Sequence, residues 1–177
     1  MATRTCRIGL HGRNNPRFED IDFRVIKEAN VEAVKMMSQS ESWVFERIKN
    51  ENPNIEIITR LYDDRIGEGH HPTPQEFAQR MSPIMGTLRP YCAKFQVLNE
   101  PNHLHRYEGW CKEDADAEDF NRWFLEAYQL LKSAHPWALI GFPGLAVPDG
   151  AHRDRAGRDQ VVGKAGEPLG HRLHATG

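Results

Sequence analysis

Short apolar segments alternate with longer amphipathic segments through most of this chain. The third apolar segment, residues 55–62, is rich in β-branched residues, and each of the first four segments is followed by a stretch with helical spacing. Such alternation within one sheet requires right-handed crossover connections, which leave the strands parallel. The sequence therefore predicts an α/β fold of about five parallel βα units. The expected strands are residues 7–11, 31–37, 55–62, 94–98 and 138–142.

The amphipathic stretches predict the helices between these strands. Asp20 is a candidate cap for the first, and either Ser40 or Ser42 for the second. The third begins near Thr73, and Pro83 inside it is expected to kink or break it. In the first two helices, the residues expected to face the core are Ile21, Val25, Ile26, Ala29, Trp43, Val44 and Ile48.

Composition excludes several classes of function. The chain has 177 residues, of which 39% are hydrophobic and 27% are charged, and its formal net charge is -2. That balance argues against a general nucleic-acid-binding protein, and no apolar run has the length of a membrane span. The first residues lack the apolar region of a secretory signal. The sequence as written therefore predicts a cytoplasmic protein, with a secreted origin as the alternative.

Residues 149–177 differ in character from the rest of the chain. They contain six glycines, four arginines and three histidines, no aromatic residue, and neither a strand nor a helix period. We therefore predict a partial barrel over residues 1–148 and an irregular tail over residues 149–177. A misread or frameshifted tail is a second interpretation of its glycine and arginine content.

Residues with polar or aromatic side chains stand where the predicted strands end. In parallel α/β sheets, ligands bind at the carboxyl ends of the strands. We expect four of the five strand ends to carry groups suited to a sugar. The residues at the ends are His11, Met37, Arg60 with Tyr62, Asn99 with Glu100, and Phe142.

The fourth predicted strand runs directly into Asn99-Glu100-Pro101. Pro101 disfavours a helical conformation at Glu100 and predicts an extended one. The segment thus places one amide and one carboxyl side by side at the rim of the sheet. We interpret Glu100 as a general acid/base for cleavage of a sugar–oxygen bond. A turn built from asparagine and proline is the alternative explanation of the same residues.

A strand followed by Asn-Glu-Pro at the fourth position of a βα series resembles the acid/base motif of clan A retaining glycoside hydrolases. The resemblance covers roughly residues 7–147. It implies a partial (β/α)8 TIM-type barrel, with Glu100 as acid/base and Asn99 bonded to the sugar 2-hydroxyl. It also implies a nucleophilic glutamate after a seventh strand, and the sequence offers no such strand. A whole barrel needs about 250 residues, so we expect a truncated barrel, and hydrolysis by this chain stays an open question.

The second carboxylate of a glycosidase has no clear candidate in the sequence. Asp63 and Asp64 follow the third strand, and Glu108 lies in the loop after the fourth. Each is interpreted first as a solvated loop carboxylate. Glu167 is the one glutamate of the tail, and no strand leads into it.

Other side chains are candidates for binding the sugar or for packing. We expect Arg60 and His11 to bind hydroxyl groups, with an ion pair and a hydrogen-bonded rim histidine as the alternatives. Tyr62 and Trp110 are candidate platforms for a sugar ring. We expect no cofactor and no metal site, because the paired histidines lack the helical spacing of metal ligands. The residues expected to pack are Trp43, Trp123, Trp137, Cys6, Cys92 and Cys111, and the histidines in question are His70, His71, His103 and His105.

Three functions remain open at this point. The first is a β-glycoside hydrolase by lineage, and the second is a non-catalytic carbohydrate-binding or structural fragment. The third is a different parallel α/β enzyme in which Asn99-Glu100 occurs by accident. Five strands leave two unpaired sheet edges, so we also expect self-association into a homo-oligomer through those edges.

Overall fold

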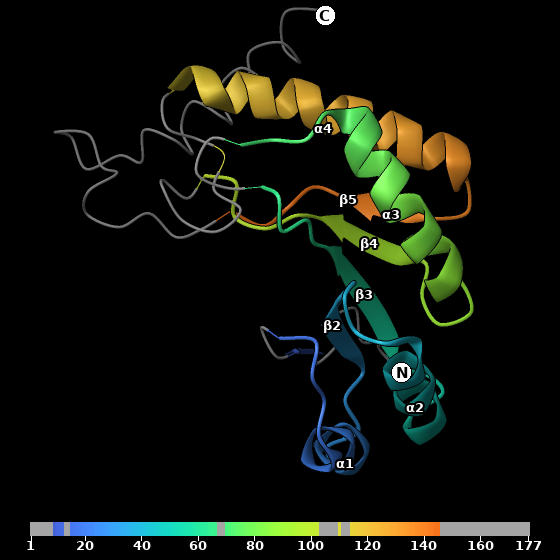
Figure 1. Ribbon diagram of the computed structural model, residues 1–177. Coiled ribbons are helices and arrows are strands. Elements are labelled where there is room, and N and C mark those ends of the chain that lie inside the picture. The colour runs from blue at the N-terminus through green and yellow to red at the C-terminus, as the bar shows by residue number, and fades with distance from the viewer. Residues whose placement is uncertain (1–8, 13–14, 67–69, 103–109, 111–113, 146–177) are drawn as a thin grey trace, which may run out of the picture. The chain divides into compact units, whose positions relative to one another are not determined.

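The computed structural model describes residues 9–12, 15–66, 70–102, 110 and 114–145. Strands and helices alternate through these residues (Figure 1). The elements are β1 (Gly9–His11), α1 (Asp20–Glu28), β2 (Ala33–Met37), α2 (Ser42–Glu51), β3 (Glu56–Leu61), α3 (Pro74–Leu88), β4 (Lys94–Val97), α4 (Asp114–Ala134) and β5 (Leu139–Gly141). The predicted boundary near residue 148 lies outside the described residues.

The strands form one parallel sheet in the order β1-β2-β3-β4-β5. Strand β3 shows the alternation of a sheet with a packed face: Ile57, Thr59 and Leu61 are buried, and the residues between them are half-buried. The described residues therefore form an open sheet of parallel βα units, a partial (β/α)8-type barrel. The α/β fold class predicted from the alternation is confirmed.

The chain divides into two compact units. Unit 1 comprises Met1–Tyr62, Gln79–Val97 and Leu131–Gly141, and it contains the five described strands. Unit 2 comprises Asp63–Ala78, Leu98–Leu130 and Phe142–Gly177. Unit 2 is thus built from the segments that follow β3, β4 and β5, together with most of α4.

The packed face of α1 differs from the predicted one. Phe23 and Ile26 are buried, whereas Ile21 and Val25 are 43% and 41% exposed. The helix begins one residue after Glu19, which forms a capping box with Asp22, so Asp20 is not the cap. The shift of the buried face leaves two aliphatic side chains of α1 exposed.

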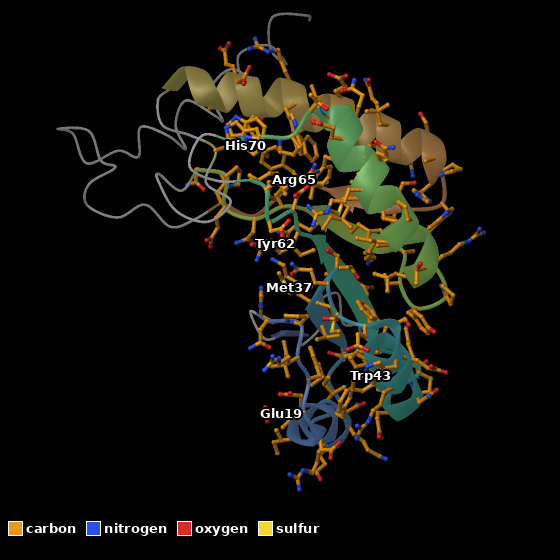
Figure 2. The ribbon with its side chains drawn as sticks, viewed as in Figure 1. Glu19, Met37, Trp43, Tyr62, Arg65 and His70 are labelled. Atoms are coloured by element: carbon orange, nitrogen blue, oxygen red, sulfur yellow. The ribbon has the colours of Figure 1, made fainter. Side chains whose placement is uncertain are left out.

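Helix α2 also turns a different aromatic residue inward. Trp43, labelled in Figure 2, is 45% exposed. Its indole N–H donates to the Glu41 carboxylate at 3.0 Å. Phe45 is fully buried in its place. The prediction that Trp43 packs in the core is wrong, because its indole N–H finds a polar partner at the surface.

Pro83 does not break α3, which runs without interruption from Pro74 to Leu88. A proline removes one helical hydrogen bond, here to the carbonyl four residues earlier. Both Pro83 and Gln79 are exposed, so water can satisfy that carbonyl. The predicted break is therefore wrong, and the alternative of a kink stays a prediction.

Cys92 is buried, and its sulfur lies 3.2 Å from the Thr59 hydroxyl. Burial raises the pKa of the thiol, and this effect outweighs the opposing hydrogen bond from Thr59. The predicted buried thiol is confirmed for Cys92, and Cys6 and Cys111 lie outside the described residues. Of the helices in the described part of the chain, none combines the length and apolar character needed to cross a bilayer.

Candidate active site

The backbone after β4 is unusual at two of its first three residues. Leu98 and Glu100 have φ angles of 53° and 48°, in the left-handed region that residues other than glycine seldom adopt. The extended conformation predicted for Glu100 is therefore wrong. The Glu100 N–H donates to the Gly144 carbonyl at 2.8 Å. Pro101 disfavours the right-handed helical region at Glu100, and the bond to Gly144 fixes the left-handed one.

Buried neighbours hold this segment in place. Leu98 is fully buried, and Pro101 and Asn102 are also buried. The Pro101 carbonyl accepts a hydrogen bond from the Trp110 N–H at 2.8 Å. Glu100 and Asn99 themselves are half-buried. Strained backbone is retained where surrounding contacts fix it, and it gathers at functional sites.

Trp110 packs inside unit 2. It is 4% exposed, and its ring stacks on His71 with centroids 3.6 Å apart and planes 8° apart. The platform expected of Trp110 needs an open ring face, and this ring is covered. The role predicted for Trp110, a platform for a sugar ring, is therefore corrected to packing. The stacking contact also gives His71 a partner that the sequence did not reveal.

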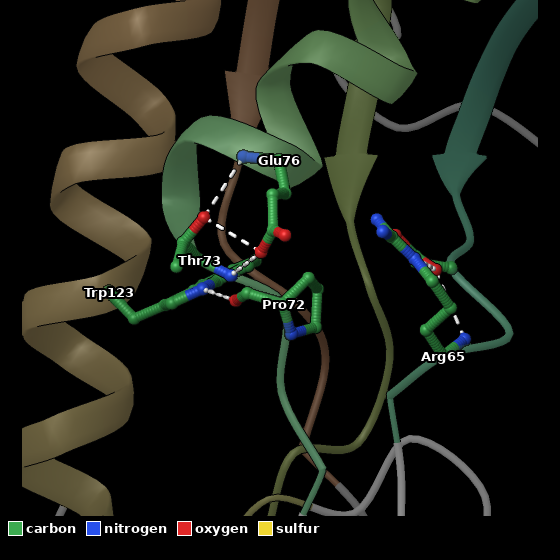
Figure 3. Close-up of polar contacts among 6 residues, drawn as sticks. Arg65, Pro72, Thr73, Glu76 and Trp123 are labelled. Carbon is green, nitrogen blue, oxygen red and sulfur yellow. Dashed lines mark hydrogen bonds and ion pairs between the residues drawn. The ribbon is translucent and has the colours of Figure 1, made fainter.

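The aromatic cluster of unit 2 continues from Trp110 to helices α3 and α4. Trp123 lies 5.1 Å from Trp110 and 5.0 Å from Phe77, measured between ring centroids. Its indole N–H donates to the Pro72 carbonyl at 2.7 Å (Figure 3). The predicted burial of Trp123 is confirmed, since it is 7% exposed. In unit 1, Trp137 is half-buried with its ring edge against Phe95.

Asp63 is not the solvated loop carboxylate that the sequence suggested. Its side chain is fully buried and paired with Arg65 by two hydrogen bonds, from Nη2 at 2.7 Å and from Nε at 3.0 Å (Figure 3). The Arg65 N–H also donates to the carboxylate, at 3.0 Å. The pKa of the Arg65 guanidinium is raised, chiefly by its hydrogen bond to Asp63. The Asp-x-Arg spacing was the signal for this pair in the sequence.

Thr73 and Glu76 cap the start of α3. The Thr73 N–H and hydroxyl donate to the Glu76 carboxylate at 2.8 and 2.9 Å, and the Glu76 N–H lies 3.2 Å from the Thr73 hydroxyl (Figure 3). The pKa of Glu76 is lowered, first by the backbone N–H and then by the hydroxyl of Thr73. This cap fixes the end of the segment that follows β3.

Replacing Thr73 with alanine removes the hydroxyl side of the cap. We expect a loss of about 1 kcal/mol in the free energy of unfolding at pH 7, with Thr73→Ser close to wild type. Because the pKa of Glu76 is lowered in the folded state, the ionised carboxylate stabilises the fold at pH values above 4.5, the ordinary pKa of this group. That stabilisation is lost as the pH falls from 4.5 through the lowered pKa. The difference between wild type and Thr73→Ala in urea denaturation should therefore narrow below pH 4.5. If wild type and Thr73→Ala differed in unfolding free energy by the same amount at pH 7 and at pH 3.5, the role of the Glu76 carboxylate in this cap would be contradicted.

The remaining predicted site residues lie in unit 1. The Arg60 guanidinium lies 5.4 Å from the centre of the Tyr62 ring, and the Tyr62 N–H donates to the Ser38 hydroxyl at 3.1 Å. Figure 2 labels Tyr62, which directly follows β3. His11 is exposed at the end of β1, where its Nδ1 lies 2.8 Å from the Gly12 carbonyl. Because a carbonyl only accepts, the bond requires the proton on Nδ1 and leaves Nε2 for a ligand.

The structure thus groups the predicted residues in two sets. Arg60 and Tyr62 are in contact within unit 1, and Asn99, Glu100 and Trp110 belong to unit 2. Glu108, His103 and His105 lie outside the described residues. Within the described ranges, no cluster of three or more histidine, cysteine or acidic side chains has the arrangement of a metal site.

Solved structures share the arrangement of strands and helices described above. The structure of N2152 from Neocallimastix frontalis aligns with a TM-score of 0.58 and 18% identity over 81% of this chain. A β-glycosidase, BGL167, aligns with a TM-score of 0.53 and 13% identity over 69% of this chain. A family 39 glycoside hydrolase from the gut symbiont Bacteroides cellulosilyticus WH2 aligns with a TM-score of 0.50 and 11% identity over 77%.

This chain shares the fold of one part of these structures. The alignments span 38%, 43% and 31% of those three proteins, so the shared part is a fragment of their length. No protein-family model and no curated protein sequence matches the chain. At these identities the likeness concerns the fold, and it agrees with the partial TIM-type barrel that the motif after β4 implied.

Proposed function

We propose that this chain is the acid/base-bearing part of a retaining glycoside hydrolase for a β-linked sugar, with Glu100 as general acid/base. One observation carries the proposal. Asn99 and Glu100 stand directly after the fourth strand of a parallel βα sheet, and that fold is shared with a β-glycosidase. The strained, hydrogen-bonded backbone at Glu100 supports it, because such strain gathers at functional sites.

The chemistry assigned to Glu100 has two steps. Its carboxyl group gives a proton to the leaving oxygen as the carbon–oxygen bond of the glycoside breaks and a second carboxylate bonds to the sugar carbon. Its carboxylate then takes a proton from the water that cleaves the glycosyl–enzyme bond. A half-buried position suits this exchange, since the group must reach both substrate and water.

The second carboxylate is not Asp63. Its side chain is fully covered, and the Arg65 guanidinium donates to both of its oxygens. A nucleophile needs an open approach to the sugar carbon, which a covered, paired carboxylate does not offer. We assign no nucleophile among the described residues, and Glu108 and Glu167 lie outside them. Among the described residues, the proposal thus assigns one member of the catalytic pair, Glu100.

We also propose sugar-binding roles for four residues. Asn99 would bind the 2-hydroxyl beside Glu100. Arg60 would donate to a hydroxyl group, His11 Nε2 would accept from one, and Tyr62 would offer a ring for the sugar face. The contact between Arg60 and Tyr62 supports a shared role for these two side chains.

The proposal is tested with the full chain and a panel of nitrophenyl β-glycosides. Release of nitrophenol above the uncatalysed rate supports hydrolysis. Calorimetry with the matching unsubstituted glycosides measures binding separately. Binding without release would favour the non-catalytic carbohydrate-binding alternative. A chain that neither binds nor hydrolyses any member of the panel would overturn the assignment of a sugar site.

A further inference from the structure

Within the described residues, the sheet of unit 1 ends at β1 on one side and at β5 on the other. Of the described strands, β1 pairs only with β2, and β5 pairs only with β4. Both strands are three residues long and run in the same direction. Unpaired strand edges are templates for further pairing. Because the two edges face opposite ways along one parallel sheet, the β5 edge of one sheet can continue into the β1 edge of another.

The hydrogen bonds already made identify the groups on each free edge. The Leu139 N–H donates to the Ala93 carbonyl, and the Gly12 N–H donates to the Lys35 carbonyl. Neighbouring residues of a parallel strand direct their backbone groups to opposite sides. The outward groups are therefore those of Ile140 on β5, and those of Gly9 and His11 on β1.

These groups match in a parallel pairing that aligns Ile140 with Leu10. The Ile140 N–H then donates to the Gly9 carbonyl of the other sheet, and the His11 N–H donates to the Ile140 carbonyl. Leu10 and Ile140 lie on the same face of the sheet, because Leu10 aligns with Val34 and Ile140 with Phe95 in the existing register. The pairing therefore keeps the side chains of Leu10 and Ile140 on the same face of the extended sheet.

Apolar side chains accompany the β1 edge. Leu10, Ile21 and Val25 are 42%, 43% and 41% exposed. Leu10 and Val25 also line a groove of about 130 Å³ between β1 and α1, together with Phe18, Ile26 and Val34. On the other edge, Leu139 is 58% exposed. Contact between the two edges would remove these side chains from water.

Charge also favours contact between unlike edges. Helix α1, beside β1, has three acidic and two basic residues. Residues 131–145, around β5, contain Lys132 and no acidic residue. Helix α1 beside the β1 edge thus has a small net negative charge, and the segment around the β5 edge has a small net positive charge. In a sheet that curves as part of a barrel, a two-fold axis along the barrel joins β5 of each copy to β1 of the other, so two copies satisfy all four edges.

We propose that the occupant of these edges is a second copy of this chain, paired β5 to β1 at both contacts. The proposal concerns the sheet of unit 1 and does not depend on the proposed glycosidase function. It predicts a dimer of the full chain that uses both edges equally.

Two proline variants test the pairing. Ile140→Pro removes the outward N–H of β5, and His11→Pro removes the outward N–H of β1, while the inward bonds of the neighbouring residues remain. Sedimentation at micromolar concentrations should give a dimer for wild type and a dissociation constant at least about tenfold higher for each proline variant. The matched controls Ile140→Val and His11→Gln keep the N–H groups and should dimerise as wild type does. Circular dichroism checks that each variant is folded.

Amide hydrogen exchange of the wild-type chain provides a second measurement that needs no variant. Protection at Ile140 and His11 should rise with protein concentration. A wild-type monomer across the concentration range would overturn the proposal, as would coverage of the edges within one chain, seen as protection independent of concentration. An effect of only one proline variant would also overturn it, because pairing of like edges uses only one strand type.

Discussion

Replacing Glu100 with glutamine is expected to lower kcat for β-glycosides with poor leaving groups by about 10²–10⁴-fold, the usual contribution of a general acid/base. The amide cannot give a proton to the leaving oxygen or accept one from water. The loss in kcat/KM, which reports the step in which the leaving group departs, should be smaller for nitrophenyl glycosides, because nitrophenolate leaves with less help from an acid. Steady-state rates on both substrate types measure this difference.

Glu118→Gln is the matched control for this experiment. Glu118 is an exposed glutamate on α4, in the same unit as Glu100. It should retain the wild-type rate on both substrate types. Equal losses in the two variants would mean that Glu100 acts no differently from a surface carboxylate. A loss independent of the leaving group would exclude the acid role.

Replacing Phe77 with alanine is expected to lower the free energy of unfolding by about 3–5 kcal/mol. Phe77 is fully buried in α3, with its ring edge against Trp123 at 5.0 Å. The change removes an aromatic side chain and leaves a cavity in the cluster of unit 2. Small domains are stable by only about 5–15 kcal/mol, so the variant should unfold at much lower urea concentration.

Leu125→Ala serves as the control for Phe77→Ala. Leu125 lies on α4 and is 57% exposed, so its truncation should stay within about 0.5 kcal/mol of wild type. Tryptophan fluorescence follows both variants, since Trp123 lies beside Phe77. Similar midpoints for the two variants would contradict the packing described for unit 2.

The sequence predicted the sheet because the sheet depends on local pattern. Strand β3 is rich in β-branched residues, and each of the first four strands is followed by a helical period, so the parallel direction followed from the connections. The positions of individual side chains were harder to predict. Trp43 and Val25 fit a helical stripe, but the buried face was chosen by Phe23 and Phe45 through tertiary packing.

The sequence identified Glu100 as a candidate site residue, but it did not predict the backbone conformation of that residue. Glu100 was found from its position after the fourth strand. Its left-handed backbone depends on the Gly144 carbonyl, a backbone group far along the chain that no residue type signals. The covering of Trp110 by His71 likewise arises from a contact between separate segments, which local patterns do not encode. The pairing of Asp63 with Arg65 is local, and the spacing of two residues signals it.

A titration of the isotopically labelled full chain with an unsubstituted β-glycoside tests the central claim most directly. If the sugar binds beside Glu100, the amide signals of Glu100, Asn99 and Gly144 should shift together, because the Glu100 N–H donates to the Gly144 carbonyl. The account predicts saturable shifts at these three residues and none at the exposed Glu118. Shifts confined to other parts of the chain, or no shift at millimolar sugar, would contradict it.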